Sequence, residues 1–323
     1  MTQPLALIFP GQGSQQIGML RELAERYSVV RTTFTEAGDA LGYDLWQVVQ
    51  EGPAESLNAT ACTQPALLAA SVAIWRVWQE LEGARPSVMA GHSLGEYSAM
   101  VCAGVMSFAD GVRLVRLRGE AMQEAVPVGE GAMAAILGLD DAAVEQACEQ
   151  AAQGDVVSAV NYNAPGQVVI AGSKAAVERA IAACQQAGAK RAMPLPVSVP
   201  SHCELMRPAA ERLAQAMNDI ELKAPRYKVI QNVDGQAHDD IATLRTRLIE
   251  QLYRPVRWTS CVEAMIGLGA EVFIECGPGK VLTGLNKRVA KGSRGLAIND
   301  PDSLSSALEL ARSAADSSSS AQG

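Results

Sequence analysis

Short apolar segments alternate with longer amphipathic segments along almost the whole chain, and this alternation constrains the fold more than any other feature. Apolar runs that end at glycine or proline predict buried strands, here at residues 5–9, 87–90, 229–232 and 272–275. Amphipathic stretches predict helices at residues 16–27, 63–81 and 108–124, the second capped by Thr63 with Pro65 in its first turn. Strands that alternate with helices predict an α/β protein, here with a central, mostly parallel, doubly wound sheet.

The middle of the chain has a different order of elements. Its pattern predicts a strand, a helix, two strands, a helix and a strand, at residues 131–139, 140–152, 156–161, 167–171, 175–187 and 190–197. This βαββαβ order is typical of the ferredoxin-like motif. We therefore expect a small ferredoxin-like subdomain at 128–198, inserted into a large catalytic α/β domain formed by 1–127 and 199–312, and a disordered tail at 313–323.

Charge and composition exclude several classes of protein. The formal net charge of −8 argues against nucleic-acid binding, which needs a basic face, and no apolar run reaches the roughly 18 residues of a membrane helix. The 7 cysteines contain no C-x-x-C pair, which indicates reduced thiols in a cytoplasmic protein without a metal site. We also expect a monomer.

The strongest local motif is G-x-S-x-G at residues 91–95, which lies between a predicted strand and a predicted helix. This is the context in which a sharp turn projects a nucleophilic serine, here Ser93, from the edge of a sheet. The five-residue pattern alone also occurs in structural turns.

A serine hydroxyl needs a base, and the chain offers only 3 histidines. His92 adjoins Ser93 and neighbours on a sharp turn point apart, whereas His238 lies in a polar stretch typical of a solvated loop. His202 stands where an extended segment meets a helical pattern, the kind of junction where α/β sheets collect their ligands. Elimination favours His202 as the base; the alternative is a histidine that caps a turn.

Helical periodicity places Arg118 among the apolar residues of the predicted helix 108–124. A buried guanidinium needs an anionic partner. That partner is either an internal carboxylate or a substrate carboxylate held by the guanidinium fork. Two glycine loops, at 10–15 and 277–280, fail the tests for dinucleotide and phosphate loops, but the first could present backbone N–H groups beside Ser93 as an oxyanion hole.

Longer motifs are spread over nearly the whole chain: FPGQGSQ at 9–15, TQPA at 63–66, GHSLGEYSA at 91–99, RLRG at 116–119, NYNAPGQVVIAG at 161–172, VSVPSHC at 197–203, QLYRPVRW at 251–258 and GPGKVLTGL at 277–285. With these motifs the chain resembles a known family, the malonyl-CoA:acyl carrier protein transacylases of bacterial fatty acid synthesis, and it is similar to the acyltransferase domains of polyketide synthases. The resemblance implies a hydrolase-like α/β domain that carries an inserted ferredoxin-like subdomain.

The resemblance implies ping-pong transfer of a malonyl group from malonyl-CoA to the phosphopantetheine thiol of acyl carrier protein, with no cofactor. It implies that Ser93 is acylated, that His202 is the base and that Arg118 binds the malonyl carboxylate. It also implies an oxyanion hole formed by the backbone N–H groups of Gln12 and Leu94, and a histidine held by Gln251 in place of a catalytic Asp.

Three other functions compete with malonyl transfer. The serine motif alone also fits a thioesterase or carboxylesterase, the transferase could serve another carrier, and the chain could be a carrier-binding scaffold without catalysis. The resemblance also implies an acidic carrier protein, so docking on this negatively charged chain needs a local basic patch. Candidate patches are Lys287 with Arg288 and Lys190 with Arg191; the alternative for the first is an ordinary solvated helix end.

Overall fold

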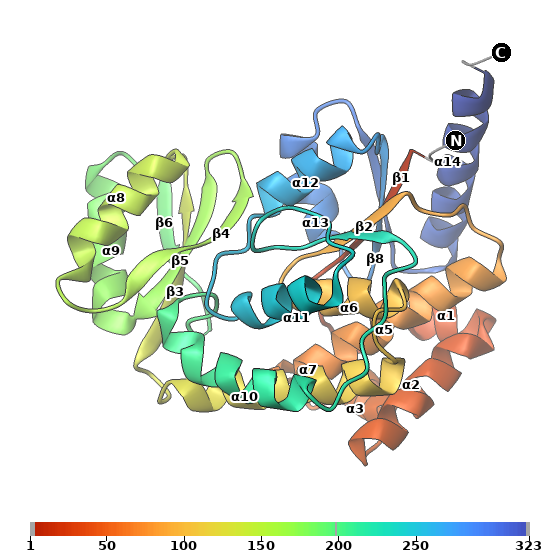
Figure 1. The fold of residues 1–323 in the computed structure, drawn as a ribbon, viewed down its shortest axis with the longest axis horizontal. Coiled ribbons are helices and arrows are strands. Elements are labelled where there is room, and N and C mark those ends of the chain that lie inside the picture. The colour runs from red at the N-terminus through yellow and green to blue at the C-terminus, as the bar shows by residue number, and fades with distance from the viewer. Residues whose placement is uncertain (1–3, 198, 321–323) are drawn as a thin grey trace.

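The computed structural model describes residues 4–197 and 199–320, and its centre is a five-stranded parallel sheet (Figure 1). The order of the strands is β7-β2-β1-β8-β9. The strands are β1 (Leu5–Phe9), β2 (Val88–Gly91), β7 (Lys228–Ile230), β8 (Val272–Cys276) and β9 (Arg294–Ile298). Every residue of β1 is buried, as expected for a strand covered on both faces of a parallel sheet.

Helices cover both faces of this sheet, and alternate residues of β1 face different layers. The larger hydrophobic core, on one face of the sheet, contains Leu5, Leu7 and Phe9. The smaller core, on the other face, contains Ala6 and Ile8 together with residues of α12 and α13. The helices of this part are α1 (Arg21–Arg26), α2 (Ser28–Leu41), α3 (Leu45–Glu51), α4 (Ala54–Asn58), α5 (Thr60–Glu80), α6 (Leu94–Cys102), α7 (Phe108–Ala125), the 3₁₀ helix η1 (Glu204–Met206), α10 (Arg207–Met217), α11 (Ile241–Glu250), α12 (Trp258–Gly267), α13 (Val281–Val289) and α14 (Pro301–Ser320).

A separate antiparallel sheet stands beside the parallel one, with two helices on one of its faces (Figure 1). Its elements follow the order β3 (Gly131–Leu137), α8 (Asp141–Ala152), β4 (Val157–Ala164), β5 (Gln167–Ser173), α9 (Lys174–Gln186) and β6 (Arg191–Pro194). The strand order β4-β5-β3-β6 is that of a ferredoxin-like fold. The predicted fold class is confirmed, while the division into folding units at 128 and 198 stays a prediction.

Several local predictions differ from the structure. The last strand of the antiparallel sheet, predicted at 190–197, spans only Arg191–Pro194. The first helix begins only at Arg21, because Leu20 has a left-handed φ of 62° that interrupts the helical backbone before it. Helix α5 begins one turn earlier than predicted, at Thr60, and the Thr63 hydroxyl donates to the carbonyl of Leu57 instead of capping the helix.

The tail predicted to be disordered from residue 313 is helical as far as Ser320, and residues 321–323 lie outside the described residues. The helix continues because Ala311 and Ala314 are buried on the face that Leu304 and Leu308 begin. Within residues 4–197 and 199–320, no helix is long and apolar enough to cross a membrane. The cytoplasmic location and the monomeric state stay predictions.

Candidate active site

The turn between β2 and α6 carries Ser93 at φ 53° and ψ −111°, outside the regions that L-residues favour. Such a conformation costs on the order of 1–3 kcal/mol. The flanking glycines make the turn possible. A Cβ on Gly91 would lie 1.9 Å from the carbonyl of Gly95, and a Cβ on Gly95 would lie 2.0 Å from the carbonyl oxygen of Phe9. The motif therefore occupies the strand–turn–helix context that the sequence predicts.

His202 lies against Ser93. Its Nε2 is 2.8 Å from the Ser93 hydroxyl oxygen, and its Nδ1 is 2.6 Å from the backbone carbonyl oxygen of Gln251. Because a carbonyl only accepts, we assign the ring proton to Nδ1, which leaves Nε2 to accept from the serine. Burial, reinforced by the positive charge of Arg118, lowers the pKa of His202 to about 3, so the ring is neutral at physiological pH.

The other two histidines have different partners. His92 Nε2 lies 2.7 Å from Oδ1 of Asn163 on β4, and its ring packs at a tilt against Trp258. His238 Nε2 lies 2.9 Å from the Asp234 carboxylate. Of the three histidines, all in the described part of the chain, His202 alone contacts the Ser93 hydroxyl.

Arg118 on α7 points inward, with only 1% of its surface exposed. Its Nη1 donates to Gln64 Oε1 at 2.9 Å, and its Nη2 donates to Gln251 Oε1 at 3.0 Å and to the Ser93 hydroxyl at 3.3 Å. Among the described residues, no carboxylate forms an ion pair with it and its Nε has no hydrogen-bond partner. The buried Glu96 carboxylate acts on the guanidinium only at a distance, with Gln251 bonded to both groups. A buried guanidinium without a direct carboxylate contact among the described residues therefore stands beside Ser93.

Gln251 is fully buried and contacts Ser93, His202 and Arg118. Its backbone carbonyl accepts from His202, its Oε1 accepts from Arg118, and its Nε2 donates to the backbone carbonyl of Ser93 at 2.9 Å. The predicted link to the histidine is thus made by the main chain, while the side chain ties the arginine to the serine turn.

The glycine loop after β1 packs against the serine turn. A Cβ on Gly11 would lie 2.6 Å from the His92 carbonyl oxygen, so only glycine allows the two backbones to approach this closely. The next residue, Gln12, and the first residue of α6, Leu94, have backbone N–H groups without a hydrogen bond to any residue that the structure describes. Both amides remain available for an oxyanion.

The sequence analysis missed a buried polar group beside this site. The Glu96 carboxylate is fully buried and accepts from the backbone N–H of Asn232 at 2.8 Å, from Gln251 Nε2 at 3.0 Å and from Gln231 Nε2 at 3.1 Å. Two signals could have found these residues. Glu96 is an acid in an otherwise apolar helix start, and Gln231-Asn232 directly follows an apolar strand whose end meets the sheet edge.

The predicted docking residues divide into two kinds. Lys190, Arg191 and Lys287 are exposed. Arg288 is also exposed, but it donates to Gln167 Oε1 at 2.6 Å and to the carbonyl of Pro165 at 2.7 Å, and so joins α13 to the β4–β5 hairpin. Arg288 therefore has a structural partner that the sequence did not indicate.

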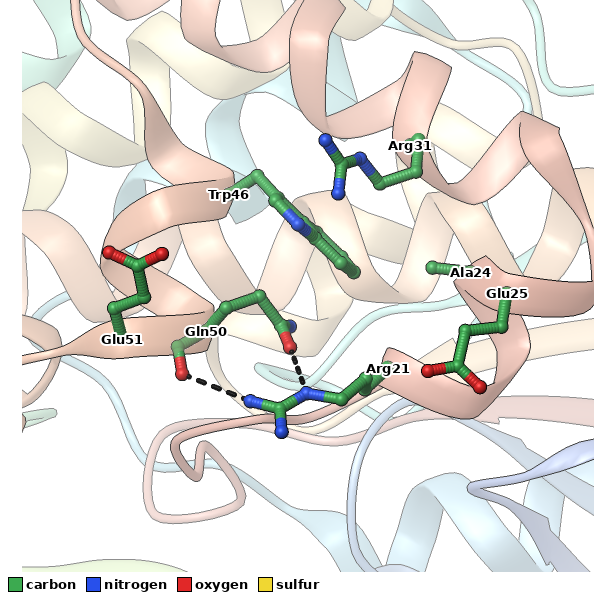
Figure 2. A pocket seen from close by; sticks show the side chains of 7 residues that line it. All are labelled: Arg21, Ala24, Glu25, Arg31, Trp46, Gln50 and Glu51. Carbon is green, nitrogen blue, oxygen red and sulfur yellow. Dashed lines mark hydrogen bonds between the residues drawn. The ribbon is translucent and has the colours of Figure 1, made fainter.

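A surface pocket of about 510 Å³ lies elsewhere, between α1, α2 and α3 (Figure 2). Trp46 stands at its centre, and Arg21 donates to the side chain and the carbonyl of Gln50 at its edge. It contains none of the predicted site residues.

Comparison with known proteins places the chain in one family. The family model described as an acyl transferase domain matches residues 6–299. The malonyl CoA-acyl carrier protein transacylase of Salmonella typhimurium is 61% identical over 308 residues, covering 95% of this chain and 99% of the relative. That of Escherichia coli is 60% identical over 310 residues, covering 96% and 100%.

Solved structures extend the likeness to the fold. An acyl carrier protein S-malonyltransferase from Vibrio cholerae superposes with a TM-score of 0.93 at 62% identity, covering 94% of this chain and 99% of that one. A malonyl-transacylase solved in complex with a type II PKS acyl-carrier protein has a TM-score of 0.94 at 58% identity, covering 95% and 99%. The chain therefore belongs to the acyl transferase domain family, among the malonyl CoA-acyl carrier protein transacylases.

Proposed function

We propose that this protein transfers the malonyl group from malonyl-CoA to the phosphopantetheine thiol of acyl carrier protein and so supplies malonyl-carrier for fatty acid synthesis. The observation that carries the proposal is one convergence of groups. The Ser93 hydroxyl lies 2.8 Å from a neutral imidazole and 3.3 Å from a buried guanidinium that lacks a carboxylate partner among the described residues. The relatives, malonyl CoA-acyl carrier protein transacylases by name, use the same donor and acceptor.

In the first half-reaction, Ser93 Oγ attacks the thioester carbon while its proton passes to Nε2 of His202. The backbone N–H groups of Gln12 and Leu94 donate to the resulting oxyanion. When the tetrahedral intermediate collapses, the carbon–sulfur bond breaks, the malonyl group stays on Ser93 as an ester, and CoA leaves with the proton from His202.

The second half-reaction reverses these roles. His202 takes the proton of the phosphopantetheine thiol, whose sulfur attacks the ester carbon. The carbon–oxygen bond breaks, and Ser93 recovers its proton from the imidazole. Every proton in both halves is carried by these two side chains, so the proposed chemistry calls for no cofactor.

Arg118 supplies the selectivity in this proposal. Its Nε–H has no partner among the described residues, and its Nη2 would exchange the contact with the Ser93 hydroxyl for the malonyl carboxylate, which gives a charge-assisted pair of hydrogen bonds. A carboxylate held there also fixes the ester so that its open face meets the incoming thiol, which favours transfer over hydrolysis.

The carrier protein would dock through exposed basic residues, against the overall negative charge of the enzyme. Lys190, Arg191 and Lys287 are free for this role, and Arg288 would serve it while it also holds the hairpin. That a relative 58% identical has been solved with an acyl-carrier protein supports a carrier as the partner.

Intact-mass analysis after exposure to a panel of acyl-CoAs tests the proposed function. We expect one malonyl group on the peptide that contains Ser93, with a single burst of CoA and steady turnover only when holo carrier protein is added. Steady release of CoA without carrier would instead establish a thioesterase.

A further inference from the structure

One side-chain amide spans the serine turn. Asn232, fully buried just after β7, donates from Nδ2 to the carbonyl oxygen of Gly91 at 2.7 Å and accepts at Oδ1 from the backbone N–H of Ser93 at 2.8 Å. Both ends of the amide are therefore used on the two peptide groups between which the chain reverses. The reverse orientation of the amide would place N–H against N–H and oxygen against oxygen.

The turn needs such support because Ser93 has a φ of 53°, a conformation that a serine rarely adopts. Its N–H is held by Asn232 and its carbonyl by Gln251 Nε2 at 2.9 Å. Both peptide groups of the residue are thus fixed by side chains from distant parts of the chain, and the direction of Oγ toward His202 follows from them.

The buried carboxylate of Glu96 fixes both supporting residues. It accepts from the backbone N–H of Asn232 and from Gln251 Nε2, and its other oxygen accepts from Gln231. All three partners are donors, so protonation of either oxygen places an O–H against an N–H. The contacts therefore fit an acceptor-only, ionised group, although burial raises the pKa of Glu96 to about 7.

We propose that Asn232 is a positioning residue, which holds Ser93 in its left-handed conformation with Oγ against His202, and that Glu96 anchors it. This rests on the proposed function of Ser93. Asn232 bonds to the backbone of the turn, to Glu96 and, at Oδ1, to Gln251 Nε2 at 3.3 Å. Arg118 is held by the other atom of the Gln251 amide, Oε1, so Asn232 acts on the nucleophile and leaves the malonyl carboxylate to Arg118. Its loss therefore slows acylation without weakening the binding of malonyl-CoA.

The first test compares Asn232→Ala with Gln50→Ala. Gln50 is a matched control, because it too is a buried amide that uses both ends. It accepts from Arg21 in the surface pocket (Figure 2) and donates to the backbone carbonyl of Met19. We expect the acylation rate constant at saturating malonyl-CoA to fall about ten- to a hundredfold in Asn232→Ala. The malonyl-CoA concentration that gives half of the maximal rate should stay unchanged. Gln50→Ala should lower the melting temperature and keep the rate.

The conservative variant Asn232→Asp gives a readout that a purely structural role would not move. An ionised Asp keeps the acceptor for Ser93 but presents a second oxygen to Gly91, whereas a protonated Asp restores the donor. Charged or titratable groups around this position are Glu96, Arg118, His202, Asp234 and Cys261. The rate of Asn232→Asp relative to the wild type should therefore rise as the pH falls from 8 to 5.5, while that of Asn232→Ala stays level.

Two outcomes overturn the proposal: an acylation rate in Asn232→Ala equal to that of Gln50→Ala, or a relative rate of Asn232→Asp that does not change with pH. If Asn232→Ala does not fold, the Asp variant decides alone. Labelling of Ser93 by a fluorophosphonate, which needs no malonyl group, separates this proposal from the proposed function. A wild type that reacts with the phosphonate but takes no malonyl group refutes the function, and slower phosphonate labelling of Asn232→Ala still supports the positioning role.

Discussion

Arg118→Ala should convert a malonyl-selective site into one that no longer distinguishes malonyl from acetyl. The arginine is buried, it has no ion-pair partner among the described residues, and its Nε is free, so the substrate carboxylate is the anion it can bind. Truncating one partner of a buried, hydrogen-bonded charge pair costs about 2–5 kcal/mol. At about 1.4 kcal/mol per tenfold, malonyl acylation should fall about thirtyfold or more relative to acetyl acylation.

Both acyl groups share a smaller loss, because the variant also removes the contact of Arg118 with the Ser93 hydroxyl at 3.3 Å. The assay is single-turnover release of CoA from malonyl-CoA and acetyl-CoA at matched concentrations. Arg116→Ala is the control, since Arg116 lies on the same helix in a surface ion pair with Glu120. Equal losses for the two acyl groups would refute the reasoning and make Arg118 a structural residue.

Three further predictions concern the nucleophile, the base and the carrier. Ser93→Ala should keep its fold and take up no malonyl group by intact mass, whereas label on a cysteine in the wild type would contradict the mechanism. Because burial lowers the pKa of His202 to about 3, its ring should show no NMR titration between pH 5 and 8, and a midpoint near 6.5 would contradict the burial seen here. The KM for carrier protein at low salt should rise in Lys287→Glu and, separately, in the double variant Lys190→Glu with Arg191→Glu. Acylation by malonyl-CoA should stay unchanged in both variants. An unaltered KM in both would exclude this docking surface.

Much of the fold and the centre of the site could be predicted because their signals are local. The position of Ser93 follows from a strand–turn–helix pattern, and the inward direction of Arg118 follows from helical periodicity. His202 could be selected because only three histidines compete. The roles of Gln12, Leu94 and Gln251 came from the family resemblance.

The remaining features depend on contacts between distant segments, which no local pattern contains. Asn232 lies 139 residues from Ser93 in the sequence, and Gln251 lies 155 residues from Glu96. From the sequence alone, a polar residue after a strand is compatible with a solvated loop. Only the order of strands in the sheet shows that the end of β7, which Asn232 follows, lies beside β2 and the serine turn. Arg288 is a similar case, because its partners lie on the β4–β5 hairpin.

The partner of His202 sets a limit on what this site can cleave. Nδ1 donates to the neutral carbonyl of Gln251 at 2.6 Å, which stabilises an imidazolium less than a carboxylate would, and burial with Arg118 lowers the pKa further. A base this weak gives little help in removing the Ser93 proton during the attack. It therefore suits the electrophilic carbonyl of a thioester better than the carbonyl of an amide, which the nitrogen lone pair stabilises by resonance. We therefore expect malonyl thioesters to acylate Ser93 and the matching malonyl anilide to remain intact over the same period. Release of the aniline at a rate comparable to thioester cleavage would show that the carbonyl partner does not limit the base.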